Sequence, residues 1–293
     1  MSQSLVVFQS LWSMERRHSD GWERSLEENA QMIAAAGFDG ISAHYTNRAY
    51  VRRLAELRSD FKLDAEGQCF PRTVDDLKPV LENATEFGLH HLDIQADIRP
   101  RTVKECVELL DGWQRLIDQV DFPVYLETHR DRMTTDLLFT LDLLDARPDL
   151  KLLGDLSHYL VGREFAWPVS AENHALMHRI LDSSWAFHGR VASREQVQIE
   201  ISFAPHRMWV DLFLEWWRYG FASWKKRAGE NDSLAFVCEL GPKPYAIIGR
   251  DGNDTTDRWA ESLLLRDWAR ELWAEVCVEQ ASTDASAVKQ VTL

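Results

Sequence analysis

The stretch PVYLETHRDRMTTDLLFTLDLLDARPDLKLLGD, residues 123–155, contains the pattern that decides the fold. Its short apolar run at 124–127 predicts a strand, and the apolar residues that recur at helical spacing over 135–144 predict a helix. A second short apolar run, at 151–155, predicts the next strand. A strand, a helix and another strand within about 30 residues are typical of a parallel βαβ unit.

The same unit repeats through the whole chain. Strands are predicted at 5–9, 40–44, 62–68, 91–95, 124–127, 151–155, 184–188 and 234–240, and helices at 21–36, 48–58, 74–87, 103–120, 135–144, 171–181, 208–227 and 256–279. Gly37 and Gly88 follow two of these helices as terminating glycines, and Thr73 precedes a helix with acidic residues in its first turn. Eight βα units predict an α/β fold, a (β/α)8 TIM barrel, with a doubly wound open sheet as the alternative.

Length and composition favour one domain. The chain has 293 residues, close to the roughly 250 of a typical barrel, and no linker rich in Pro, Gly or Ser divides it. We therefore expect a single barrel domain at 1–281 and a flexible C-terminal tail at 282–293. The four cysteines form no CxxC pair, so a disulfide framework or zinc ribbon is not expected and a cytoplasmic location is.

The charge balance excludes some partners. A net charge of −14 repels a phosphate backbone, so nucleic acid is not an expected partner. No apolar stretch approaches the ~20 residues of a membrane span, and the first residues lack the basic segment of a signal peptide. We expect instead a small-molecule substrate.

Four consecutive predicted strands carry a potential metal ligand at or near their C-terminal ends: Glu127, Asp155, His188 and Glu239. In a (β/α)8 barrel these ends meet at one rim, where the working groups lie. An acidic residue at one strand end is more often a turn or cap residue, but three carboxylates at one rim repel each other unless a cation compensates them. Oxygen-rich ligation with one imidazole predicts one divalent ion, Mn²⁺, Mg²⁺ or Co²⁺ in preference, with Zn²⁺ possible.

With these four residues and the segments GDLSH, HGR and ELGPKPY, the chain resembles the xylose isomerase-like TIM barrels over most of its length. This superfamily is also known as AP endonuclease family 2 or the sugar phosphate isomerase/epimerase superfamily. The resemblance implies that Glu127, Asp155, His188 and Glu239 bind the metal and that His158 contacts the substrate. It further implies that Glu127 and Glu239 are the catalytic acid and base on opposite faces of a sugar.

Further side chains near the predicted strand ends are candidates for substrate binding: Arg190, His129, Gln68, Gln95, His44 and Trp12. Arg190 would clamp a hydroxyl, carbonyl or phosphate, unless it is a loop arginine paired with a carboxylate. His129 is equally suited to supporting the metal-binding carboxylate. Trp12 would form an aromatic wall against the C–H groups of a sugar.

These residues predict a divalent-metal-dependent sugar isomerase or epimerase, which abstracts a proton next to a carbonyl through a metal-stabilised enediolate. The alternative is a metal-dependent lyase or dehydratase acting on a keto-sugar or 3-keto-glycoside. A phosphodiesterase like endonuclease IV is less favoured because of the net charge, and a non-catalytic structural role is the last alternative. We also expect a homo-oligomer. The tryptophans of the outer helices, such as Trp216 and Trp217, are expected to pack on the barrel, and the alternative is an exposed aromatic stripe at an oligomer interface.

Overall fold

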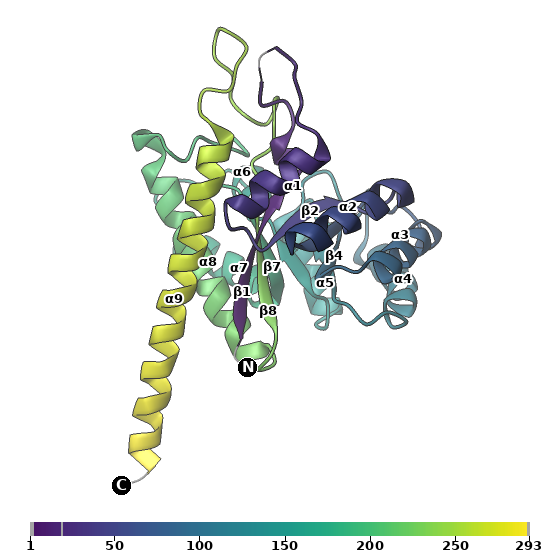
Figure 1. Ribbon diagram of the computed structural model, residues 1–293. Helices are drawn as coiled ribbons and strands as arrows, with labels where there is room; N and C mark the ends of the chain where they lie inside the picture. The colour runs from purple at the N-terminus through teal and green to yellow at the C-terminus, as the bar shows by residue number, and fades with distance from the viewer. Residues whose placement is uncertain (1–2, 19, 292–293) are drawn as a thin grey trace.

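The structure, a computed structural model, describes residues 3–18 and 20–291, with side chains described as far as residue 280. Within these residues eight parallel strands close into a barrel in chain order (Figure 1). They are β1 (Ser4–Ser10), β2 (Gly40–His44), β3 (Asp64–Cys69), β4 (His91–Ile94), β5 (Val124–Glu127), β6 (Leu152–Gly154), β7 (Ser184–Gly189) and β8 (Ser233–Cys238). Because β1 pairs with β8 from Ser4–Ser233 to Gln9–Cys238, the barrel is confirmed and the open sheet is wrong.

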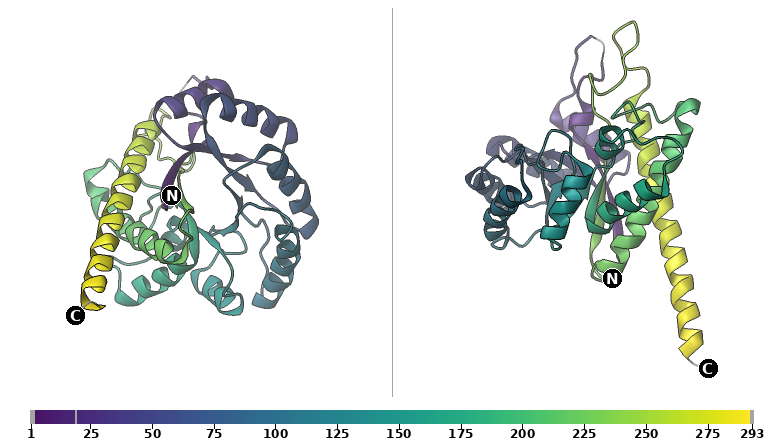
Figure 2. Two further views of the ribbon diagram at one scale, coloured as in Figure 1. Left: turned by 60° about the horizontal axis from the view of Figure 1, so that its bottom comes forward. Right: turned by 180° about the vertical axis from the view of Figure 1, so that it is seen from behind.

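The helices surround the strands, as the view from the N-terminal side of the barrel shows (Figure 2). They are α1 (Leu26–Ala35), α2 (Arg48–Phe61), α3 (Val74–Phe87), α4 (Val103–Ile117), α5 (Leu137–Ala146), α6 (Ser157–Gly162), α7 (Ala171–Ser183), α8 (Arg207–Arg227) and α9 (Arg258–Val291), with short 3₁₀ turns η1 (Trp12–Met14) and η2 (Ala204–His206). The six-residue α6 and the two turns were not predicted, because they are too short for an apolar period to appear. Among the described residues, no helix is long and apolar enough to cross a membrane.

The predicted helix ends depend on local capping, which the structure confirms. Thr73 caps α3 in a capping box with Asp76, and Gly88 ends the same helix with φ of 71°. The first helix starts later than predicted, because Ser25 is its N-cap in a capping box with Glu28. At the other end of the chain, α9 continues beyond residue 279 to Val291. The predicted flexible tail at 282–293 lies partly outside the described residues and stays a prediction.

Side chains alternate between the two sides of the barrel wall. The outward-facing set packs under the helices, and Phe236 of β8 belongs to it: the ring of Trp217 of α8 meets it edge-on at 5.1 Å. Trp216 and Trp217 are both buried, Trp217 against β8 and Trp216 beside His174 of α7. The inward-facing set forms a smaller apolar cluster of Phe8, Tyr125, Leu153, Ala186, Ala235 and Val237. Two residues after the inward-facing Tyr125 and Ala186, Glu127 and His188 face the same side of the wall, at the rim of the barrel.

Gly220 allows α8 to approach β7 closely. A Cβ at this position would lie 2.7 Å from Cζ of Phe187, whose ring is fully buried. We expect Gly220→Ala to lower the free energy of unfolding by about 1–3 kcal/mol, because overpacking outweighs the better helix propensity of alanine. Gly162→Ala is the control, since its Cβ would meet nothing within 4 Å. Urea unfolding of both variants checks this, and equal stability would contradict it.

Candidate metal centre

The four predicted ligands come together at the C-terminal rim of the barrel. Glu127 is the last residue of β5, Asp155 follows β6 directly, His188 lies in β7 and Glu239 follows β8 directly. One ligand atom from each lies within 4.8 Å of the others, and all four side chains are buried. Ligands of one divalent ion, with bonds of ~2.0–2.3 Å, lie about 3–4.5 Å apart, so this spacing fits a single ion.

Several polar atoms of this group are buried without a hydrogen-bond partner. They are Oε1 of Glu127, Oδ2 of Asp155 and Nδ1 of His188. The His188 Nδ1 lies 3.0 Å from Oε2 of Glu239 and 3.4 Å from Oε1 of Glu127, yet it makes a hydrogen bond to neither. Buried polar atoms are almost always satisfied in folded proteins, so three such atoms, on residues whose ligand atoms lie within 4.8 Å of one another, fit a bound cation.

The electrostatics of the group reflect crowded negative charge. Burial lowers the pKa of His188, but the carboxylates of Glu239 and Glu66 outweigh burial and hold that pKa well above its ordinary value. Burial raises the pKa of Asp155, while the nearby His158 and Arg190 bring it below its ordinary value. A metal ion would replace the proton on His188, because only the neutral imidazole is a ligand.

Arg190 is a buried part of the centre. Its Nη2 donates to Oε2 of Glu239 at 2.6 Å, and its Nη1 lies 3.5 Å from Oδ2 of Asp155. Its guanidinium also lies 5.5 Å from the ring centre of Trp12 and 4.9 Å from that of Tyr245. The guanidinium thus offsets part of the carboxylate charge, and the predicted contact of Arg190 with substrate stays a prediction.

Two glutamines hold the ligand carboxylates in place. Gln68 Nε2 donates to Oε1 of Glu239 at 3.2 Å, and Gln95 Nε2 donates to Oε2 of Glu127 at 2.7 Å. The Gln95 carbonyl accepts from Nε of Arg132 at 3.1 Å, which sets the orientation of its amide. Glu127 therefore keeps its Oε1 without a hydrogen-bond partner, whereas Oε2 of Glu239 accepts from Arg190. Supporting hydrogen bonds of this kind commonly orient carboxylates at metal sites.

His158 and His129 lie together beside the centre. The Nε2 of His158 is 3.4 Å from Oδ2 of Asp155, and its ring centre is 3.9 Å from that of His129. Both nitrogens of the fully buried His158 lack a hydrogen-bond partner. Burial lowers the pKa of His158, and burial together with His158 lowers that of His129 to about 4. Two neutral imidazoles are thus ready to hydrogen-bond a polar ligand.

A cavity of about 220 Å³ opens over the centre. It brings together the remaining predicted substrate-binding residues with others, and its lining is Trp12, His44, Gln68, Phe70, Gln95, His129, Arg132, Arg190, Glu239 and Tyr245. Phe70, Arg132 and Tyr245 were not predicted to line the site, and they follow strand ends by one to several residues. Tyr245 stands edge-on to Trp12 at 5.1 Å, so the cavity has an aromatic wall.

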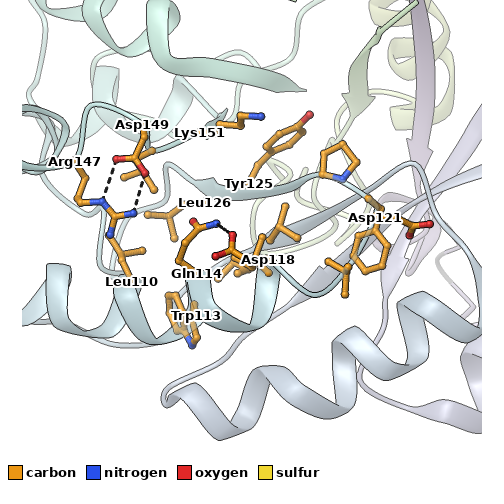
Figure 3. Close-up of a pocket in the computed structure, with 17 residues that line it drawn as sticks. Leu110, Trp113, Gln114, Asp118, Asp121, Tyr125, Leu126, Arg147, Asp149 and Lys151 are labelled. Atoms are coloured by element: carbon orange, nitrogen blue, oxygen red, sulfur yellow. Dashed lines mark hydrogen bonds and ion pairs between the residues drawn. The ribbon is translucent and has the colours of Figure 1, made fainter.

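A larger cavity of about 480 Å³ lies away from these residues, between α4, β5 and the segment before β6. Four of its polar side chains form two pairs: Arg147 with Asp149, and Gln114 with Asp118 (Figure 3). Potential metal ligands converge at the rim and not here, within the described residues. The smaller cavity is therefore the candidate site.

A second polar layer lies below the ligands and was missed by the sequence analysis. Glu66 of β3 and His91 and Asp93 of β4 are fully buried, and Glu66 Oε1 lies 3.1 Å from Nε2 of His188. These residues precede Gln68 and Gln95 by two or four positions, so they share the inward parity. The two-residue period of a strand, extended from Gln68 and Gln95 towards the N-terminal ends of β3 and β4, would have identified them.

Comparisons with known proteins agree with the barrel. No family model matches the chain, and no curated protein matches its sequence. A D-allulose 3-epimerase from Methylomonas sp., solved in complex with D-allulose, superposes with a TM-score of 0.54 at 13% identity, covering 94% of this chain and 99% of the other. An AP endonuclease, family 2, from Brucella melitensis gives a TM-score of 0.53 at 13% identity over 83% and 94%. This likeness shows the fold alone.

Proposed function

We propose that the chain is a divalent-metal-dependent isomerase or epimerase that acts next to the carbonyl of a small sugar. One observation carries the proposal: four buried side chains at consecutive strand ends bring ligand atoms within 4.8 Å of one another, and three of these side chains have a polar atom without a hydrogen-bond partner. A bound ion would polarise the substrate carbonyl and stabilise the negative charge that develops on its oxygen. We infer Mn²⁺, Mg²⁺ or Co²⁺ from the three carboxylates and single imidazole.

Glu127 and Glu239 are the proposed acid and base. They lie on different strands and face the same space, and glutamine amides hold one oxygen of each. One carboxylate removes the proton from the carbon next to the carbonyl, and the electron pair moves onto the carbonyl oxygen. The other returns a proton to the opposite face, or to the neighbouring carbon. A positioned carboxylate contributes typically about 10²–10⁴-fold to such a step.

The lining of the cavity suits a neutral, hydroxyl-rich substrate. His129 and Arg190 offer polar atoms in the lining, and Trp12 with Tyr245 offers an aromatic surface for C–H groups. The buried His158 lies next to His129. The epimerase that shares the barrel fold was solved with D-allulose bound, which makes free ketoses the first substrates to try. The volume of about 220 Å³ also favours a monosaccharide-sized ligand.

The test is exchange of the proton next to the carbonyl. The protein is loaded with Mn²⁺ and incubated in D₂O with a panel of ketoses, and deuterium incorporation is followed by NMR. We expect exchange that disappears with a chelator and returns with Mn²⁺, accompanied by an epimer or aldose. Failure of the purified protein to bind a divalent ion would contradict the proposal.

Two other outcomes would select the alternative chemistries. Exchange with release of an eliminated group, above all from a 3-keto-glycoside, would identify a lyase. Metal-dependent cleavage of abasic DNA at physiological salt would identify a phosphodiesterase, against the expectation from the net charge of −14. Oligomeric state and cytoplasmic location stay predictions.

A further inference from the structure

One half of the barrel interior is polar. The inward-facing side chains of β2, β3 and β4 include Ser42, Glu66, His91 and Asp93, all of them essentially inaccessible to solvent. The interior of a (β/α)8 barrel is normally filled with branched apolar side chains, as it is on the β5–β8 side of this one. A buried polar layer of this kind requires a partner for every group.

Asp93 is the group whose partners are missing. Neither of its carboxylate oxygens has a hydrogen-bond partner, and its side chain is 0% exposed. Glu66 beside it is held firmly: Ser42 Oγ donates to its Oε1 at 2.7 Å, and His91 Nε2 lies 2.8 Å from its Oε2. Burial, and next the charge of Glu127, raise the pKa of Asp93 well above its ordinary value.

The surrounding charge is not balanced by one ion. Among the described side chains, five buried carboxylates gather in and above the barrel interior: Glu66, Asp93, Glu127, Asp155 and Glu239. The guanidinium of Arg190 and one divalent ion at the rim would offset three of these five negative charges. The two carboxyl groups of the deeper layer, Glu66 and Asp93, then need either a proton, which the raised pKa of Asp93 favours in the metal-free protein, or a second cation in its place.

We propose that Glu66, Asp93 and His188 form a second divalent-cation site beneath the rim. One ligand atom from each lies within 4.8 Å of the others, so the three atoms surround a single position, into which the unpartnered Asp93 carboxylate is directed. Two carboxylates and one imidazole suit Mg²⁺ or Mn²⁺.

The two positions share His188. Its Nδ1 lies 3.0 Å from Glu239 at the rim, and its Nε2 lies 3.1 Å from Glu66 below. When both nitrogens bind an ion the imidazole is fully deprotonated, and its proton leaves to solvent, as does any proton on Asp93. Ions bridged by one imidazole are close enough for their electron spins to interact.

The experiment counts Mn²⁺ ions per chain by equilibrium dialysis and examines the loaded protein by electron paramagnetic resonance. We expect two ions per chain in the wild type, with a spin-coupled spectrum. Asp93→Asn should bind one ion, without coupling and with little change in the affinity of the rim site. Asp93→Leu, which replaces the unpaired carboxylate by an apolar group, is the second variant in case the amide disturbs folding.

Asp254→Asn is the matched control. Asp254 also carries a buried oxygen without a hydrogen-bond partner, but it lies in the segment before α9, outside the barrel interior. This variant should keep two ions. One ion in the wild type, retained in Asp93→Asn and lost in Glu239→Gln, would overturn the deeper site and leave the proposed function standing. No bound ion in the wild type would overturn both.

Discussion

Glu127→Gln is expected to lower the rate of metal-dependent proton exchange by about 10²–10⁴-fold without unfolding the protein. The amide cannot take up the substrate proton, and it is a poorer metal ligand than a carboxylate. The fold should tolerate it, because the glutamine oxygen can keep the hydrogen bond that Glu127 Oε2 accepts from the Gln95 amide. Its amide nitrogen would then take the place of Oε1, which lies 3.4 Å from Nδ1 of His188. Exchange in D₂O and Mn²⁺ affinity are measured on the same preparation.

Glu261→Gln is the control for this variant. Glu261 is also buried, at 4% exposure, but accepts its hydrogen bonds from Ser202 in the loop after β7. It should keep both exchange and metal binding. Undiminished exchange in Glu127→Gln would remove Glu127 from the chemistry. If Glu127→Gln binds Mn²⁺ more weakly but exchanges protons at the wild-type rate once it is loaded with the ion, the role of Glu127 would be limited to metal binding.

The fold could be predicted because each βα unit carries its own local signals. Apolar runs mark the strands, and side chains such as Ser25 and Thr73 form the hydrogen bonds that start helices. Boundaries failed where a backbone conformation decides them. The helix predicted to end at 58 continues to Phe61, because Lys62 adopts the left-handed conformation that ends α2. That conformation is uncommon for lysine, so the residue type at position 62 does not indicate the end of a helix.

The grouping of the four candidate ligands could be predicted because strand ends of a closed barrel meet at one rim. The structure brings Glu127 and His188 together as expected, although their binding of a metal stays a prediction. The deeper layer could not be predicted in the same way. Whether Glu66 and Asp93 face the interior depends on the parity of each strand, and their neighbours depend on the stagger between strands.

The burial of Arg190 leads to the second large expected effect, on stability. Arg190→Met should lower the free energy of unfolding of the metal-free protein by about 3–5 kcal/mol, because Glu239 and Asp155 lose a buried counter-charge. At about 2–4 °C per kcal/mol for a large domain, this is a fall in Tm of roughly 10 °C. Methionine keeps most of the apolar stem, so loss of packing contributes little.

Three further measurements separate loss of charge from general damage. Arg130→Met is the control: Arg130 is exposed, stacks over Tyr245 at 5.0 Å, and its substitution should change stability by no more than about 0.5 kcal/mol.

In the wild type the pKa values of Asp155 and Glu239 lie below their ordinary values. Their stabilisation is therefore present at neutral pH and lost as pH falls, so the gap between wild type and Arg190→Met should narrow in acid. Mn²⁺ should stabilise Arg190→Met more than the wild type at the same concentration and so narrow the gap, because in the variant the ion supplies the missing positive charge; an ion at a hundred times its Kd contributes about 2.7 kcal/mol. A gap that is constant with pH and unaffected by Mn²⁺ would mean that Arg190 stabilises by packing alone.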